Sequence, residues 1–477
     1  MLNYIENILC HFENCFSRKA AFRWFVAIII GLMLRSDKLG VTSIIRDLAL
    51  NPGCYDSILH FFRASSWSLD EIRKRWFSAV RQYALLYREG GFRVLVGDGV
   101  KQSKEGRRMP GVKKLFQESE NSAKPEYIHG HMFGGLGILA GSVRNWACIP
   151  LSIRLHDGLQ AAREWKGASV SAASHVVQMV EDAYHAALPF GDSLLLLDRY
   201  FLTVPALEKL KSLNASGDVR MEIITKAKKS CTAFQKPGPR KPGRGRPPKK
   251  GTTVHIKELF VSHNGQFRET GIELYGKTET IRYYCIDLLW GQKLYQELRF
   301  VLVEMNGIQS ILASTSLTLD PLSIIRLYSY RFRIECTFRE LKQQTGAFCY
   351  HFWSKYMPKL NYYQRNGEPV PLERAEGEKP RKKILEAVRA IEMHMALSCI
   401  AMGILQSLSI RFTGKISSSQ IRYQRTPSKG RVSEATLMHY FRQHFFQLLS
   451  QKPELSITQI IQRLQKEPEE QWDSLVS

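Results

Sequence analysis

Five side chains of types that bind phosphate or metal recur at helical intervals in residues 328–343, YSYRFRIECTFRELKQ. They comprise an aromatic, one acid and three bases: Tyr328, Arg331, Glu335, Arg339 and Lys342. At about 100° per residue all five fall on one face of a helix, beside an apolar stripe of Ile334, Phe338 and Leu341. We therefore expect the charges at the edge of the core, where a lone carboxylate among bases could bind a metal ion and phosphates. The competing interpretation is a solvated face with an ordinary ion pair between Glu335 and Arg339.

A single carboxylate makes a metal site only if others join it, and two aspartates are the candidates. Mg²⁺ prefers oxygen ligands and takes one or two carboxylates per ion, so a pair of ions needs about three in total. Asp98 closes the apolar run FRVLVGD, within residues 92–100, and Asp198 closes SLLLLD. Each run predicts a buried strand that stops near its aspartate, and α/β sheets place ligands beyond the carboxyl ends of their strands. By itself, either aspartate could equally be a turn residue.

The spacing within residues 328–343 resembles the signature of a known family. The pattern Tyr328-x2-Arg331-x3-Glu335-x6-Lys342 is similar, without gaps, to that of the IS4-family DDE transposases, the group that includes the Tn5 transposase. The phenylalanine that accompanies this signature has its counterpart in Phe338. The resemblance extends over about residues 90–410 and is carried most specifically by this stretch.

The two aspartates support the same resemblance. Asp98, Asp198 and Glu335 match the family's Asp, Asp and Glu in order and in setting. The interval of 137 positions between Asp198 and Glu335 leaves room for the β-rich insertion that this family carries inside an RNase H-like core. The resemblance implies that these three carboxylates bind two Mg²⁺ or Mn²⁺ ions, which catalyse phosphoryl transfer on DNA.

The resemblance also implies DNA contacts and a reaction course. The remaining side chains of the signature face would hold DNA near the cut: Tyr328, Arg331, Arg339 and Lys342. Members of the family cleave transposon ends, form and reopen a DNA hairpin, and join the 3′-ends to target DNA, acting as dimers on paired ends. We therefore expect a cut-and-paste transposase whose partners are double-stranded DNA, both transposon ends and target, and a second copy of the chain.

Two further stretches offer DNA contacts. In the family an aromatic residue of the insertion stacks on a flipped base, and Trp290 in DLLWG is the candidate here; a core tryptophan is the alternative. The segment GRGRPPKK, residues 243–250, contains Arg244 and Arg246 in a pattern similar to an AT-hook. Such a hook places arginines in a narrow A·T minor groove. A basic linker that makes nonspecific phosphate contacts is the competing interpretation.

The charge of the whole chain favours the same kind of partner. With 68 Lys and Arg against 44 Asp and Glu, the formal net charge is +24, so nucleic acid is the first expectation and an anionic membrane surface the second. The longest apolar run, WFVAIIIGLML at residues 24–34, is too short to span a bilayer and predicts a buried helix. Nine cysteines without a C-x-x-C pair favour a reducing cytoplasm. The resemblance implies a bacterial, nucleoid-associated protein, and because the charge lies on Pro/Gly-rich loops and a core helix rather than on an amphipathic membrane helix, we expect no membrane binding.

Strand patterns that alternate with helical patterns after residue 91 predict an α/β fold. With the resemblance, they predict an RNase H-like core interrupted by a β-rich insertion, with helical N- and C-terminal regions. The expected segments are a helical DNA-binding domain (1–90), a first core part (91–225), a basic loop and β-rich insertion (226–304), a second core part with the catalytic helix (305–356), a polar surface loop (357–384) and a helical C-terminal region (385–477). Strands are expected in the insertion at residues 254–261, 267–276, 280–290 and 298–305.

Residues 40–64, within the first segment, carry two short helical patterns separated by Asn51-Pro52-Gly53. This arrangement is typical of a DNA-binding helix-turn-helix or of a plain helical hairpin in a bundle.

Two other functions use the same residue types. A metal-dependent nuclease that cuts without joining needs the same carboxylates, so the sequence does not separate it from a transposase. A catalytically silent DNA-binding protein derived from such an enzyme has no need of three carboxylates, and the intact Asp98, Asp198 and Glu335 argue against it.

Overall fold

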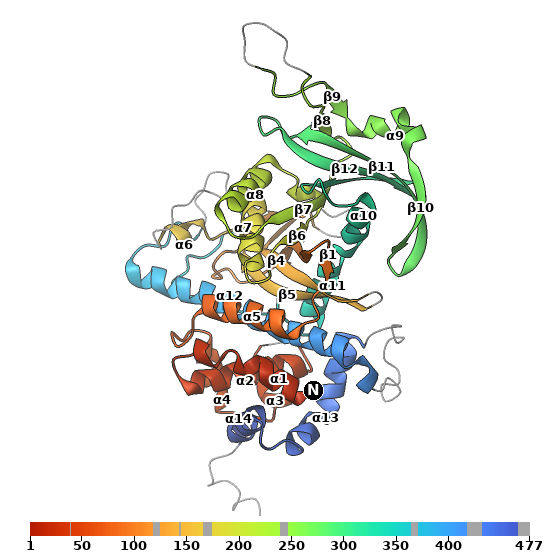
Figure 1. Cartoon of the computed structure of the whole chain (residues 1–477). Coiled ribbons are helices and arrows are strands. Elements are labelled where there is room, and N and C mark those ends of the chain that lie inside the picture. Colours follow the sequence, from red (N-terminus) through yellow and green to blue (C-terminus); the bar gives the residue numbers. More distant parts are fainter. Residues whose placement is uncertain are drawn as a thin grey trace, which may run out of the picture.

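The computed structural model describes residues 1–38, 40–117, 125–142, 145–165, 174–238, 247–363, 371–416 and 432–465. Figure 1 shows three regions along the molecule. Helices from both ends of the chain gather at one end, a sheet flanked by helices fills the middle, and curved strands form the opposite end. The residues expected to do chemistry lie in the sheet and in the helices beside it.

Five strands form the centre of the sheet. They are β2 (Phe92–Ser103), β4 (Tyr127–Ser142), β5 (Asn145–Leu155), β6 (Ser193–Leu196) and β7 (Met221–Lys226). Their spatial order is β5-β4-β2-β6-β7, in which β5, β4 and β2 pair antiparallel and β6 and β7 continue parallel to β2. Every residue of β6 is buried, which explains its apolar sequence, because a central parallel strand is covered on both faces. Two short strands, β1 (Arg88–Glu89) and β3 (Lys113–Phe116), pair with β2 and β4.

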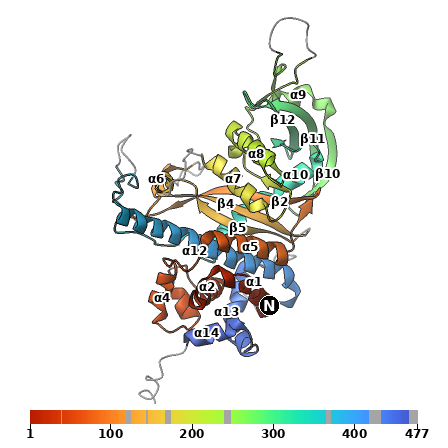
Figure 2. The same cartoon turned by 60° about the vertical axis from the view of Figure 1, so that its left-hand side comes forward.

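Helices cover both faces of this sheet. In Figure 2, α7 and α8 lie on one face, and α5 and α12 lie on the other. Their bounds are α5 (Leu69–Tyr83), α7 (His175–Ala187), α8 (Val204–Ser216) and α12 (Glu378–Arg411). α7 and α8 each begin at a side-chain cap: the hydroxyl of Ser174 accepts the amide of Val177, and that of Thr203 accepts the amide of Ala206. A short helix, α6 (Gln160–Glu164), follows β5.

α12 passes between the sheet and the helices of the chain ends (Figure 1). It begins at Glu378 rather than near residue 385, where the helical C-terminal region was expected to begin. Among the described residues it is the one helix long and apolar enough to cross a membrane, and 94% of its most apolar window is buried inside this fold. Gly403 permits this packing, because a Cβ there would lie 2.3 Å from the ring of Trp76 on α5. The apolar surface of α12 is therefore used in the core.

The helices of the two chain ends pack together. They are α1 (Leu2–Cys10), α2 (Lys19–Leu34), α3 (Thr42–Asp47), α4 (Cys54–Phe61), α13 (Glu434–Ser450) and α14 (Ser456–Gln465). One hydrophobic core joins Phe25 of α2, Phe441 of α13 and Ile461 of α14. The apolar run at residues 24–34 lies within α2, whose buried residues confirm the expected interior helix. α3 and α4 flank the predicted break in residues 40–64.

The strands after β7 extend the sheet and curve away from it (Figure 1). They are β8 (Thr232–Phe234), β9 (Thr253–His255), β10 (Arg268–Leu274), β11 (Lys277–Trp290), β12 (Gln296–Met305) and β13 (Ile308–Ser314). β13 returns to the centre by pairing antiparallel with β7. The strand expected at residues 254–261 is wrong beyond His255. A 3₁₀ turn and the short helix α9 (Leu259–Ser262) follow, because Ile256, Leu259 and Phe260 are buried at helical spacing.

Candidate active site

Asp98 lies inside β2, so the expectation that this strand stops at the aspartate is wrong. The strand continues to Ser103 because β4 pairs with it residue by residue, with Gly135 opposite Asp98. A Cβ on Gly135 would lie 2.5 Å from the ring of Phe338 on α11 (Arg333–Gln343). The glycine therefore allows α11 to approach the sheet at the level of Asp98. Glu335 is carried on the same helix, one turn before Phe338.

The signature residues do not form a single helix. α10 (Pro321–Tyr330) ends and α11 begins around Arg331 and Phe332. At this junction the Arg331 amide bonds Tyr328 O at 3.1 Å, and the Glu335 amide bonds Phe332 O at 3.1 Å. These bonds reach back three residues rather than four, so the turn is tighter than in an α-helix. The single helical face expected for residues 328–342 is therefore wrong, and Arg331 lies at a corner that turns toward the sheet.

Arg331 joins two of the three predicted carboxylates. Its Nη1 lies 3.2 Å from Oδ2 of Asp98, and its Nη2 lies 2.5 Å from Oε1 of Glu335. The Arg331 side chain is 16% exposed, whereas that of Glu335 is 49% exposed, so the bridge runs from the protein interior to the surface. Charge-assisted bonds of this kind are strong. In this structure Arg331 neutralises the acids, and Glu335 pairs with Arg331 rather than with Arg339, the partner in the competing interpretation.

Burial governs the ionisation of Asp98. Burial is the largest effect, and together with the negative charges of Glu335 and Asp198 it raises the pKa of Asp98 to about 6, against the opposing effects of Arg331 and the Gly99 amide. The Gly99 amide donates to Oδ1 of Asp98 at 2.8 Å. Asp98 and Glu335 thus share one guanidinium, and the charge of Asp198 also acts on Asp98.

Asp198 is brought beside Asp98 by the register of two parallel strands. Val96 of β2 pairs with Leu196 of β6, and each aspartate follows its strand partner by two residues. The backbone of Asp198 is held by the Thr225 hydroxyl, which donates to its carbonyl oxygen at 2.8 Å. Burial raises the pKa of Tyr328, and the charges of Asp198 and Asp98 contribute to this shift, so the tyrosine lies close to both acids. Sequence and register therefore bring Asp98, Asp198, Glu335, Tyr328 and Arg331 into one region.

The carboxylates suit a hard divalent cation in chemistry, since Mg²⁺ and Mn²⁺ prefer oxygen ligands. Within the part of the chain that the structure describes, no three His, Cys, Asp or Glu side chains converge closely enough to hold a metal ion. Arg331 instead supplies the positive charge between Asp98 and Glu335. The two-ion site expected at Asp98, Asp198 and Glu335 stays a prediction that requires these side chains to rearrange.

The other predicted DNA contacts lie in different settings. Lys342 has its ammonium 5.3 Å from the ring centre of Phe348. Arg339 is half exposed and pairs with Glu340 at 3.0 Å. Trp290 ends β11 and packs, partly buried, against the hydrophobic core. Arg244 and Arg246 lie outside the described residues.

Exposed aromatic side chains near the acids were not anticipated from the sequence. Tyr200, two residues after Asp198, is 53% exposed, and Phe332, beside Arg331, is 44% exposed. Tyr275 is 63% exposed in the turn between β10 and β11, and its charge affects the pKa of Tyr328. It has a positive φ of 53°, which is uncommon for a residue other than glycine. The sequence LYGK, a turn signal between two strand patterns, could have indicated this hairpin.

The comparison with protein families agrees with this geometry. A family model described as DDE superfamily endonuclease matches residues 11–270, more than half of the chain. The chain therefore belongs to the DDE superfamily endonucleases. The matched segment contains Asp98 and Asp198 and ends before Glu335. No curated protein and no solved structure matches the chain.

Family membership establishes the class of activity. The chain is a nuclease- or transposase-type enzyme with a DNA substrate, and nucleases of this superfamily generally use divalent metal ions. The mixed α/β architecture, with its large mixed sheet and many helices, is consistent with a DDE nuclease fold.

Proposed function

We propose that this chain is an IS4-type DNA transposase that cleaves transposon ends, through hairpin intermediates, and joins the ends to target DNA by cut-and-paste. Asp98, Asp198 and Glu335 would hold two Mg²⁺ or Mn²⁺ ions. The ions would supply activation of the attacking water or 3′-hydroxyl and stabilisation of the leaving oxygen. We further propose that the enzyme acts as a homodimer on paired ends in the bacterial cytoplasm.

The observation that carries this proposal is the contact of Arg331 with both Asp98 and Glu335. An enzyme that holds divalent cations between carboxylates has to balance their charge when the cations are absent. Arg331 does so here and can turn its planar guanidinium to a DNA phosphate when cations take its place. Tyr328, close to both aspartates, would position the same phosphate through its hydroxyl.

The topology supports an RNase H-like core. Three antiparallel strands, β5, β4 and β2, adjoin two strands parallel to β2, and the two aspartates follow equivalent positions of the adjacent parallel strands β2 and β6. The strands β8–β12, which lie between β7 and β13, support the proposal of a β-rich insertion.

The proposal is tested with linear DNA that carries the element's own ends, purified protein, Mg²⁺ and a supercoiled target plasmid. A transposase yields cut ends and products in which both 3′-ends are joined to the plasmid. Cut ends without joined products would instead establish a nuclease. Binding of the ends without any cutting would establish the silent DNA-binding protein.

A further inference from the structure

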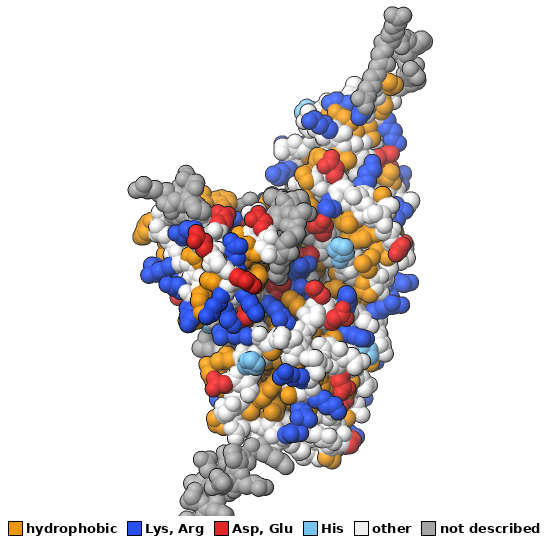
Figure 3. All heavy atoms as spheres, turned by 90° about the vertical axis from the view of Figure 1, so that its left-hand side faces the viewer, with side chains coloured by type: hydrophobic (Ala, Val, Ile, Leu, Met, Phe, Trp, Pro, Cys, Tyr) orange, Lys and Arg blue, Asp and Glu red, His pale blue; other side chains and the backbone are white. Residues whose placement is uncertain are grey.

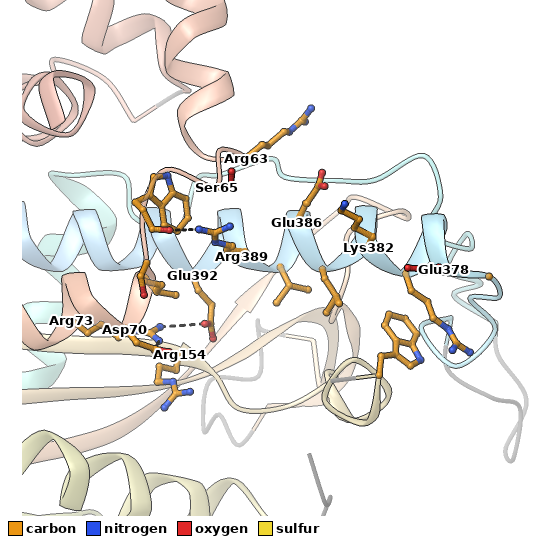
Figure 4. A pocket seen from close by; sticks show the side chains of 18 of the residues that line it. Arg63, Ser65, Asp70, Arg73, Arg154, Glu378, Lys382, Glu386, Arg389 and Glu392 are labelled. Atoms are coloured by element: carbon orange, nitrogen blue, oxygen red, sulfur yellow. Dashed lines mark hydrogen bonds and ion pairs between the residues drawn. The ribbon is translucent and has the colours of Figure 1, made fainter. Parts of the chain in front are cut away.

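A cleft of about 1020 Å³ lies between the first half of α12, the segment that leads into α5 and the end of β5 (Figure 4). Its volume is at the upper end of the range for ligand pockets, and none of its lining residues belongs to the candidate active site. Its walls carry six cationic side chains: Arg63, Arg73, Arg154, Arg381, Lys382 and Arg389. Five acids also line it: Asp70, Glu376, Glu378, Glu386 and Glu392.

On one side of the cleft, the arginines are paired with acids of the protein itself. Arg73 lies 3.3 Å from Glu392, and both side chains are largely buried. Arg154 lies 2.5 Å from Asp182, an acid of α7. Both arginines are therefore paired with acids, Arg73 in a largely buried pair and Arg154 in a pair whose arginine is partly exposed.

Arg389 on α12 is different. It is partly buried, and the Cζ of its planar guanidinium lies 3.9 Å from the ring centre of Trp67. Its Nη2 donates to the backbone oxygen of Trp67. No carboxylate of the described residues lies within ion-pair distance of it; the nearby Glu386 pairs with Lys383 at 2.7 Å. A guanidinium carries five N–H donors, and the bond to Trp67 uses one of those of Arg389.

Two exposed cations flank this arginine. Figure 4 shows Arg63 and Lys382 along the side of α12 away from the Arg73–Glu392 pair. Arg381, next to Lys382 in the sequence, lies 5.2 Å from the ring centre of Trp165 and so covers the other tryptophan of the cleft. The open side of the cleft therefore presents spaced positive charges, with Glu386, which is paired with Lys383, between them, and Arg389 packs against Trp67.

The cleft continues as a groove. A second hollow of about 580 Å³ shares Asp70, Arg73 and Arg154 with it and extends past Lys74 and His185. Figure 3, in which the face bearing the start of α12 is toward the viewer, shows many Lys and Arg side chains across the middle of this face, with acids among them. The second hollow extends the side of the cleft on which the arginines are paired with acids. On the open side, the labelled cations Arg63, Arg389 and Lys382 lie apart from one another along α12, and spaced cations suit a chain of phosphates better than a single small anion.

We propose that this groove binds the sugar-phosphate backbone of DNA away from the phosphate that is cut, with Arg389, Arg63 and Lys382 as its phosphate contacts. Arg389 serves as the fixed contact, because a planar guanidinium can bind a phosphate through two donors. The proposal rests on the proposed function only in taking DNA as the ligand. It adds a second DNA contact, built by the α5–α12 region rather than by the carboxylates.

The test measures the affinity of the full-length protein for a labelled duplex by fluorescence anisotropy, in EDTA, over a range of salt concentrations. Arg63→Ala and Arg389→Ala should each weaken binding about 5- to 10-fold near 0.1 M salt. Each should also lower the slope of log K against log salt by about 0.9, as expected for one lost phosphate contact. Lys379→Ala is the matched control, because Lys379 is an exposed cation of the same helix outside the cleft, and its slope should stay close to that of the wild type.

Arg63 is exposed, so its variant keeps the test decisive if Arg389→Ala unfolds. Because EDTA prevents cutting, these titrations report on the groove even if the protein proves not to cleave DNA. Equal slopes for Arg63→Ala, Lys379→Ala and the wild type would overturn the proposal. Competition by inorganic phosphate at low millimolar concentration, confined to the Arg63-dependent part of binding, would overturn it in favour of a free-phosphate pocket.

Discussion

The candidate active site and the α5–α12 groove each contain a partly buried arginine, and the two arginines have opposite kinds of neighbours. Arg331 forms ion pairs with Asp98 and Glu335, whereas Arg389 packs against Trp67 and has no carboxylate partner among the described residues. In the first case the acids are the functional groups and the arginine balances them. In the second the arginine is itself the binding group. In the account proposed for this molecule, the arginine shared by two acids belongs to the cation site, and the arginine packed on a tryptophan belongs to the anion-binding groove.

The largest effect on stability is expected at the largely buried Arg73–Glu392 pair of the groove. Glu392→Gln removes the charge opposite Arg73, and breaking a buried pair on one side typically costs about 3–5 kcal/mol. We expect a loss of about 3 kcal/mol in the free energy of unfolding, measured by urea denaturation. The control is Glu386→Gln, which breaks the more exposed pair with Lys383 and should cost at most about 1 kcal/mol. Equal losses of stability in Glu392→Gln and Glu386→Gln would contradict the claim that the Arg73–Glu392 pair is the more buried of the two.

A smaller effect, of opposite sign, is expected at the candidate site. Because the pKa of Asp98 is raised to about 6 in the folded protein, folding favours its protonated form. The stability that this group contributes is present below its ordinary pKa of 3.8 and is lost as the pH rises toward about 6. Asp98→Asn, which cannot ionise, should therefore be about 2–3 kcal/mol more stable than the wild type at pH 8 in EDTA.

At pH 4 the stability advantage of Asp98→Asn should shrink to nearly nothing. Thermal unfolding at both pH values checks this, with Asp56→Asn, an exposed acid of α4, as the control. An advantage that is the same at pH 4 and pH 8 would contradict the assignment of the effect to the Asp98 charge.

The smallest effect on stability is expected where α11 meets the sheet. Gly135→Ala places a Cβ 2.5 Å from the Phe338 ring and should destabilise the protein by about 1–3 kcal/mol. It should also lower DNA cleavage, because Glu335 moves with the helix. Gly271→Ala is a suitable control, since its Cβ would meet Thr278 at an ordinary 3.5 Å. Rescue of stability by the added change Phe338→Leu would locate the clash, and failure of that rescue would remove it as the cause.

Local sequence patterns were sufficient for part of the candidate site. Apolar runs that end near acids predicted a buried strand beside each of Asp98 and Asp198, and the spacing around Glu335 singled out a third carboxylate on a helix; the structure makes the two strands neighbours. The break at Arg331 was not predictable, because residues 328–342 fit helical spacing throughout and the tighter turn forms where Arg331 meets Asp98 of a distant strand.

Three other features depend on long-range packing and could not be predicted from local sequence patterns. The groove combines residues as far apart as Arg63, Arg154 and Arg389, and no local pattern joins them. Residues 256–262 have the composition of a strand, yet buried contacts of Ile256 and Phe260 hold them in helical turns. Tyr275 lies near the acids only because the β10–β11 hairpin reaches back toward α10.

The most direct test of the central claim is cleavage of DNA carrying the element's ends by wild type and Glu335→Gln, each in Mg²⁺ and in EDTA. The control is Glu13→Gln, which alters an exposed acid of the N-terminal region. The account predicts Mg²⁺-dependent cuts at the 3′-ends by wild type and Glu13→Gln. It predicts a loss of at least about 100-fold in Glu335→Gln, with DNA binding retained, because a metal ligand contributes several kcal/mol to such a reaction. Cleavage by Glu335→Gln at the wild-type rate would contradict it.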